Sequence, residues 1–178
     1  MLNLMQNARP ITSGHLQLGG TAPQGDTIAF TNYYVVRNGH PCIPVMGEFH
    51  ASRFPRQYWQ DELRKMQAGG VTIVASYIFW IHIEEEEGIF DWSGDCDMRT
   101  FVEVCQSLGL QVVLRIGPFV HGECRNGGLP DWLYGRAIAV RSNDERYLFY
   151  VRRFFAEITF LRDFESFLGQ HAGVTQIF

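Results

Sequence analysis

The sequence predicts an α/β fold in which three short apolar strands are each followed by an amphipathic helix. Apolar runs of strand length stand at residues 44–49, 72–80 and 112–116, and helical periodicity follows each of them. Strands and helices that alternate in this way are typical of βαβ units with right-handed crossovers. Two architectures fit the series, an open doubly wound sheet and a part of a (β/α)8 barrel.

The first part of the chain predicts a small β hairpin segment ahead of the main sheet. Residues 1–27 are polar and rich in glycine, and we expect them to form a loose lead-in. Residues 28–37 are rich in β-formers, and Asn38-Gly39 is a strong hairpin-turn signal. We therefore expect a boundary near residue 27, with residues 28–178 forming one domain.

The first helix is expected to begin at Pro55, because a missing N–H has no intrahelical partner at the first helical position. Trp59, Leu63 and Met66 fall at i, i+4 and i+7 and predict an apolar stripe. Gly69-Gly70 ends the helix, since glycine tolerates a left-handed cap.

The second and third units follow the same plan. Residues 72–80 are apolar almost throughout, as expected of a parallel strand that is covered on both faces. A helix at residues 97–108 leads to a third strand at residues 112–116. Ser142 and Glu145 predict a capping box at the start of a third helix.

Charge and composition exclude several classes of function. The net charge is -4 and the Lys and Arg residues are scattered, so we expect no nucleic-acid partner. No apolar run approaches the roughly 20 residues that span a bilayer, and no secretory signal is evident, so the compartment stays open. None of the 4 cysteines has C-x-x-C spacing, and residues 14–20 do not match a phosphate-binding fingerprint. We expect no cofactor.

The predicted carboxyl ends of the three strands carry polar and aromatic side chains. In both candidate architectures, ligands bind at these ends. The residues concerned are Glu48 and His50, then Tyr77 and Trp80, then His121 and Glu123. Carboxylates work on glycosidic bonds and aromatic faces pack against sugars, so this set suits a carbohydrate site.

Several motifs resemble the retaining β-galactosidases of glycoside hydrolase family 35. They are GEFHASRFPRQYWQDELRKMQAGG, then SYIFW followed by EGIFDWSG, then GLQVVLRIGPFVHGECRNGGLPDWL. The resemblance covers about residues 32–155 and implies a (β/α)8 TIM barrel that hydrolyses terminal β-galactosides through a covalent glycosyl-enzyme. For this chain it implies a partial barrel of about three βα units, with residues 28–178 as an incomplete catalytic domain.

The resemblance also implies roles for particular residues. Tyr77 and Glu123 match positions that line the galactose pocket, while His121 and Gly122 match neighbours that approach the sugar mainly through the backbone. Glu123 therefore resembles an acceptor for sugar hydroxyls, and the implied partner is a β-galactoside carbohydrate. The acid/base and nucleophile glutamates of the family are expected beyond Phe178, so no catalytic residue is assigned here and we expect the chain alone to be inactive.

The segment WIHIEEEEG departs from the family pattern. Ile81, Ile83 and Glu85 stand where the family commonly has an Asn and then His-Glu-Pro, whereas Glu84 aligns with the family glutamate. We expect residues 84–87 to form a solvated run of mutually repelling charges.

Other interpretations compete for the candidate residues. Glu123 would, in the alternative, stabilise its own glycine-rich loop, and Tyr77 would be a core residue with its hydroxyl satisfied. For His50 and Arg53, structural hydrogen bonding and substrate contact fit equally well.

A metal site is not supported by the spacing of the ligands. His121 and Glu123 match the H-x-E of zinc deaminases, but that motif needs a downstream P-C-x-x-C. Cys124 is the last cysteine of the chain, so we expect no metal site.

Two further functions stay open beside the truncated hydrolase. One is a non-catalytic galactoside-binding remnant that uses Tyr77 and Glu123, and the other is a part of a different retaining barrel glycosidase. A partial barrel should also expose the edges of its first and third strands, which invites self-association.

Overall fold

The computed structural model describes residues 9–22, 25–160 and 174–177. The chain divides between Pro44 and Val45 into two compact units. None of the helices in the described ranges is long and apolar enough to cross a membrane.

The first unit is an antiparallel sheet of four strands in the order β1-β2-β3-β4. Its strands are β1 (Gly19–Thr21), β2 (Thr27–Phe30), β3 (Val35–Arg37) and β4 (His40–Cys42). Because β1 pairs with β2, residues on both sides of position 27 belong to one sheet, and the expectation that residues 19–21 form a loose lead-in is wrong.

Turn chemistry shapes the hairpins of this sheet. Asn38 and Gly39 take φ angles of 50° and 79° and connect β3 to β4, as the sequence predicts. The expected continuous strand over residues 28–37 is interrupted at Thr31. Its hydroxyl accepts hydrogen bonds from the N–H groups of Tyr33 at 3.1 Å and Tyr34 at 2.9 Å, which turns the chain.

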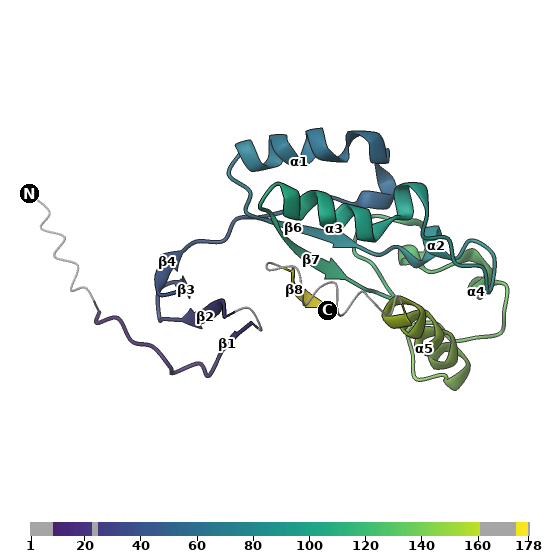
Figure 1. The fold of residues 1–178 in the computed structure, drawn as a ribbon. Helices are drawn as coiled ribbons and strands as arrows, with labels where there is room; N and C mark the ends of the chain where they lie inside the picture. The colour runs from purple at the N-terminus through teal and green to yellow at the C-terminus, as the bar shows by residue number, and fades with distance from the viewer. Residues whose placement is uncertain (1–8, 23–24, 161–173, 178) are drawn as a thin grey trace, which may run out of the picture. The chain divides into compact units, whose positions relative to one another are not determined.

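The second unit contains a parallel sheet of four strands in the order β5-β6-β7-β8. The strands are β5 (Met46–Glu48), β6 (Ile73–Tyr77), β7 (Gln111–Arg115) and β8 (Val174–Ile177). The longer helices are α1 (Trp59–Ala68), α3 (Met98–Ser107) and α5 (Glu145–Phe160). Helices α1 and α3 lie side by side across one face of the sheet (Figure 1). The α/β class is confirmed, and the sequential order of the described strands is the order found in barrels.

A fourth parallel strand is present, beyond the three strands that the sequence predicts. β8 pairs with β7, with Val112 opposite Val174 and Leu114 opposite Ile177 across a local irregularity. The sequence of β8 is short and contains a threonine and a glutamine among its four residues, so its apolar pattern is weak. The edges of the described sheet are therefore β5 and β8 rather than the first and third strands.

The first helix begins later than its sequence predicts. Pro55 precedes a 3-10 turn at Arg56–Tyr58, and α1 starts at Trp59. The predicted apolar stripe is confirmed, because Trp59 and Leu63 are buried in the core.

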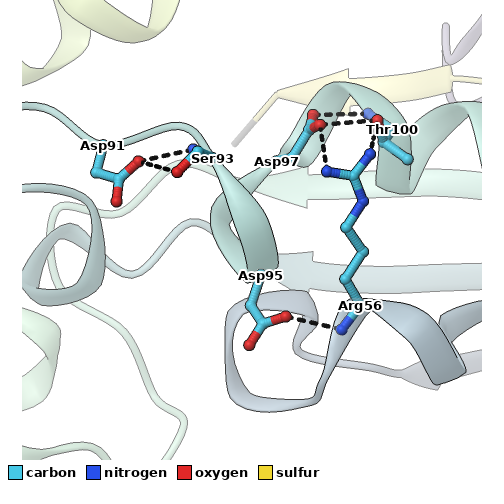
Figure 2. Close-up of polar contacts among 6 residues, drawn as sticks. All are labelled: Arg56, Asp91, Ser93, Asp95, Asp97 and Thr100. Carbon is cyan, nitrogen blue, oxygen red and sulfur yellow. Dashed lines mark hydrogen bonds and ion pairs between the residues drawn. The ribbon is translucent and has the colours of Figure 1, made fainter.

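Arg56 ties the start of α1 to the start of α3 (Figure 2). Its backbone N–H donates to Asp95 at 2.7 Å, and its guanidinium donates to the hydroxyl of Thr100 at 2.9 Å. The same guanidinium lies 3.1 Å from Asp97, which caps α3 by accepting from the Thr100 N–H at 2.9 Å. Asp97 therefore serves both as helix cap and as ion-pair partner. A separate turn, in which Asp91 accepts from Ser93, precedes this network.

Two boundaries differ from the sequence prediction for local reasons. The sequence predicts that the second strand reaches residue 80, but β6 ends at Tyr77 and the short helix α2 (Trp80–Ile83) follows. The predicted capping box at Ser142 is also wrong, because α5 begins only at Glu145. Asp144 caps that helix instead, accepting from the N–H of Arg146 at 2.9 Å, while the Ser142 hydroxyl accepts from the Asp144 N–H at 3.0 Å.

The buried apolar residues form two clusters. The larger one contains residues of the parallel sheet and of α1, α3 and α5, including Trp59, Phe101 and Phe154. The smaller one joins Tyr77, the last residue of β6, and Phe79, which lies two residues further on, to Ile81 and Val120. The remaining short helices are the 3-10 turns Ala51–Arg53, Gly94–Cys96 and Arg125–Gly128, and α4 (Asp131–Tyr134). The smaller cluster is the floor of the candidate site.

Candidate functional site

The carboxyl ends of β5, β6 and β7 meet at one edge of the parallel sheet. Tyr77 stands opposite Arg115 in the β6–β7 register, and the Arg115 guanidinium lies 4.9 Å from the centre of the Tyr77 ring. Arg115 also donates a hydrogen bond to Glu48 at the end of β5. The strands on either side of β6 are thus joined by an ion pair beside Tyr77, whose side chain is buried.

A compact loop follows β7 and carries three of the four predicted sugar-binding residues. It begins with a cis peptide bond between Gly117 and Pro118. The N–H of Val120 donates to the carbonyl of Gly127 at 2.8 Å and closes the loop. Glycine is strongly favoured at position 127, because φ is 62° there and a Cβ would lie 1.9 Å from the ring of Phe119. The loop is therefore a fixed structure with a specific backbone path.

Gly122 rests directly on the smaller apolar cluster. A Cβ added to Gly122 would lie 3.2 Å from the ring of Phe79 and 3.5 Å from Nε2 of His50. His50 in turn packs near Tyr77, with ring centres 5.7 Å apart. The structure therefore brings Tyr77 and Gly122 to the same aromatic cluster.

Glu123 is an exposed carboxylate in an uncommon backbone conformation. Its φ is 50°, a left-handed value that costs a residue with a side chain about 1 kcal/mol or more. Within the described ranges, its carboxylate has no hydrogen bond or ion pair. Asp131 holds the loop instead, accepting from Arg125 at 2.5 Å and from Asn126 at 2.6 Å. The alternative that Glu123 stabilises its own loop therefore has no contact to support it.

His121 is also exposed, at the outer side of the loop. Its ring meets the ring of Phe119 edge to face, with centres 5.1 Å apart. The guanidinium of Arg141 lies 3.9 Å from the centre of the same Phe119 ring. His121 is thus placed by an aromatic contact, and its ring nitrogens make no hydrogen bond to the residues that the structure describes.

Burial controls the charge of the two histidines beneath the loop. The pKa of His50 is lowered mainly by burial, and the neighbouring Glu48 opposes this shift. The pKa of His82 is lowered by burial and by the charge of Arg53. Both histidines are therefore held toward the neutral form at the floor of the site.

The expectation that residues 84–87 form a solvated run is wrong for Glu84. Its carboxylate is fully buried and accepts hydrogen bonds from the indole N–H of Trp80 at 2.6 Å and the N–H of Gly88 at 2.6 Å. Arg153 of α5 donates a third hydrogen bond. Glu84 therefore fixes the segment after β6 to α5 and has a structural role.

Some residues of the site are not singled out by the sequence. Arg115 ends β7 after three apolar residues, and that charge is an available signal for a role at the sheet edge. Phe79 gives no signal, because an aromatic residue in an apolar run is ordinary core. Among the described residues, no group of three His, Cys, Asp or Glu side chains is close enough to hold a metal ion.

The sequence matches a model of a known protein family. The family model for glycosyl hydrolases family 35 matches residues 34–174. The chain belongs to this family. The match covers most of the sequence, including β5, β6 and β7 in full and the first residue of β8.

Curated relatives of this family 35 chain are much longer than it is. A β-galactosidase from Xanthomonas manihotis is 44% identical over 114 residues, which are 64% of this chain and 19% of that protein. An exo-β-D-glucosaminidase from Pyrococcus horikoshii is 46% identical over 91 residues, 49% of this chain and 12% of that protein. The chain therefore spans a fifth or less of the length of these relatives.

A solved structure supports the fold of this family 35 chain. The β-galactosidase of the Antarctic haloarchaeon Halorubrum lacusprofundi superposes with a TM-score of 0.50 at 20% identity. The match covers 66% of this chain and 19% of that one, and at this identity it concerns the fold alone.

Proposed function

We propose that this chain forms part of a glycoside hydrolase barrel that acts on terminal β-galactosides, and that it contributes the sugar-holding side of the pocket. The observation that carries the proposal is Glu123, an exposed carboxylate with no partner among the described residues, held at a left-handed φ of 50°. Strained residues of this kind are concentrated at functional sites, where the surrounding structure holds them in place.

In this proposal Glu123 accepts hydrogen bonds from sugar hydroxyls. A carboxylate that accepts from hydroxyls makes short, charge-assisted hydrogen bonds, which orient the sugar ring. Tyr77 borders the pocket at the end of β6. His121 and Gly122 approach from the loop after β7, mainly through the backbone.

Bond cleavage itself needs two further carboxyl groups. A retaining glycosidase places them roughly 5 Å apart on either side of the glycosidic bond, one as acid/base and one as nucleophile. The family resemblance assigns both to positions beyond Phe178. The 178 residues are therefore expected to bind a galactoside without hydrolysing it.

A second candidate substrate for the same class of reaction is a glucosaminide. The relative from Pyrococcus horikoshii is named an exo-β-D-glucosaminidase, and its aligned segment is 46% identical to this chain. A site for glucosamine would differ in how it receives the amino group at C2 and the hydroxyl at C4. Both sugars are therefore needed in the test.

Titration calorimetry of the purified chain with galactose and with glucosamine tests the proposal. We expect heat of binding at millimolar galactose, less heat with glucosamine, and loss of binding in Glu123→Gln. The matched control is Glu103→Gln, an exposed glutamate on α3, which should bind as the unaltered chain does. Absence of heat with galactose would contradict the galactoside proposal, and stronger binding of glucosamine would favour the second specificity.

A parallel assay tests the absence of chemistry. An aryl β-galactoside incubated with the chain should release no phenol above the buffer rate. Turnover that is abolished by Glu123→Gln would show that the chain carries its own catalytic groups and would overturn this part of the proposal.

A further inference from the structure

We propose that Arg53 is a positioning residue that sets the orientation of the Gly122–Glu123 peptide and, through it, the carboxylate of Glu123. This inference rests on the proposed function, because it concerns the same sugar-holding loop. It decides between the two interpretations of Arg53 that the sequence leaves open.

Arg53 connects two segments that are far apart in the sequence. It lies in the 3-10 turn Ala51–Arg53 that follows β5, and its Nη1 donates to the carbonyl oxygen of Gly122 at 2.5 Å. A hydrogen bond from a charged donor is about twice as strong as one between neutral groups. The segment after β5 therefore reaches past β6 and holds the loop that follows β7.

The geometry of the peptide bond carries this contact to Glu123. A peptide unit is planar, so fixing the carbonyl of Gly122 also fixes the N–H and Cα of Glu123. The carboxylate of Glu123 has no partner within the described ranges. Its position therefore depends on the backbone from which the side chain extends. A rotation of this peptide would move the carboxylate away from its site.

Arg53 is itself held in a fixed place. Its guanidinium lies 5.8 Å from the centre of the Phe79 ring, which is fully buried. The neighbouring Ser52 hydroxyl is 2.8 Å from Nδ1 of His82. The His82 ring stacks on Phe79 with centres 5.1 Å apart. The donor therefore sits on the same rigid aromatic residue that supports the loop.

The loop has little other freedom at this point. Gly122 packs so closely on Phe79 and His50 that a Cβ would lie 3.2 Å and 3.5 Å from them. The cluster limits movement of Gly122 toward it, whereas rotation of the peptide about its own axis meets no such contact. The hydrogen bond from Arg53 opposes that rotation.

Nuclear magnetic resonance can observe this peptide by itself. The sequence contains two Gly–Glu pairs, Gly47–Glu48 and Gly122–Glu123. Cell-free synthesis with carbonyl-labelled ¹³C-glycine and ¹⁵N-glutamate should therefore give two carbonyl-to-amide correlations. Glu123→Gln removes one of them and assigns both, and the Gly47–Glu48 signal serves as an internal control.

The decisive variant is Arg53→Met, which keeps an unbranched apolar stem and removes the donor. We expect the Gly122 carbonyl signal to shift upfield or broaden while the Gly47–Glu48 signal stays in place. Arg53→Lys should restore part of the shift, since an ammonium can still donate. Arg64→Met, an exposed arginine on α1, is the matched control and should change neither signal.

Sugar binding supplies the second measurement. Arg53→Met should weaken galactose binding about tenfold, which corresponds to about 1.4 kcal/mol, with partial recovery in Arg53→Lys. An unshifted Gly122 signal in Arg53→Met would overturn the inference whatever the sugar does. A shifted signal with unchanged affinity would overturn it too. If the unaltered chain binds no galactose, the proposed function fails, and the carbonyl signal alone decides whether Arg53 sets the peptide.

Discussion

Arg153 donates a hydrogen bond to Glu84, and the carboxylate that receives it is fully buried. The two residues are 69 positions apart, and together they fix the segment after β6 to α5. The Arg153 guanidinium is surrounded by aromatic rings, with Tyr150 at 5.1 Å and Trp132 at 5.5 Å from their centres. Removing one partner of a buried ion pair strongly destabilises the fold, because the other partner is left as an uncompensated charge.

We therefore expect Glu84→Gln to lower the free energy of unfolding by about 3 kcal/mol, because Arg153 would keep its charge without a counter-ion. Urea denaturation followed by tryptophan fluorescence measures this change. Glu85→Gln is the control, since Glu85 is exposed and should change stability by less than about 0.5 kcal/mol. Equal effects of the two variants would show that Glu84 is solvated after all.

Glu84 also marks the limit of what local sequence patterns can predict. Four consecutive glutamates predict a solvated run, but the first of them is buried, and its charged partner lies 69 residues away. Local patterns do predict the α/β class, the Asn38-Gly39 turn, and the apolar stripe of α1. They do not predict that β8 lies beside β7, because pairing between distant segments leaves no periodicity in either one.

The sequence predicts some features of the candidate site and not others. Strand ends and motif resemblance predict that Tyr77, Gly122 and Glu123 lie together, and the structure brings Tyr77 and Gly122 to one aromatic cluster. The roles of Arg53 and Arg115 depend on which neighbour each guanidinium reaches. Tertiary packing determines these neighbours, so the local sequence around either arginine does not predict them.

Asp97 should contribute to stability in two separable ways. It caps α3 and it lies 3.1 Å from the Arg56 guanidinium (Figure 2). We expect Asp97→Ala to cost about 1.5 kcal/mol, since it removes both interactions. Asp97→Asn keeps the cap and loses only a partly exposed ion pair, so it should cost less than about 1 kcal/mol. Thermal unfolding of both variants, with Asp61→Ala on the exposed face of α1 as control, measures the difference, and equal losses for Ala and Asn would remove the capping role.

Gly127 should be the glycine least tolerant of substitution in the loop after β7. A Cβ there would lie 1.9 Å from the Phe119 ring at a φ of 62°. Gly127→Ala is expected to destabilise the chain by about 3 kcal/mol and to weaken sugar binding, because both steric overlap and backbone strain apply. Gly94→Ala is the matched control, since Gly94 has a φ of 56° with nothing near its Cβ, and it should cost about 1 kcal/mol. A Gly127→Ala variant no less stable than Gly94→Ala would mean that Phe119 moves freely.

The buried thiols should make stability depend on alkaline pH. Burial raises the pKa of Cys105 to about 12 and that of Cys96 to about 11, from an ordinary value of 9.0. A raised pKa in the folded state stabilises the fold fully below pH 9, and this contribution is lost as the pH rises through the folded values. Each thiol should reduce the unfolding free energy by about 1.4 kcal/mol per pH unit above 9. Urea denaturation at pH 8 and pH 10 checks this, and Cys105→Ala should show a smaller decrease between the two.

The same protonation should protect both cysteines from alkylation. At pH 8 the thiolate is the reactive form, so Cys96 and Cys105 should stay unmodified by iodoacetamide in the folded chain. Mass spectrometry after proteolysis identifies the labelled sites. Labelling of Cys105 at a rate equal to that in urea would contradict its burial.

The open edges of the parallel sheet should drive self-association. β5 and β8 end the described sheet, and each therefore presents unpaired backbone groups on one side. Met46, in β5, also exposes half of its side chain. We expect the chain to form dimers or larger species in sedimentation experiments at micromolar concentration. Met46→Lys places a charge at this edge and should shift the chain toward monomer, whereas Ile89→Lys, outside the sheet, should not. An unaltered chain that stays monomeric at all concentrations would show that these edges are covered.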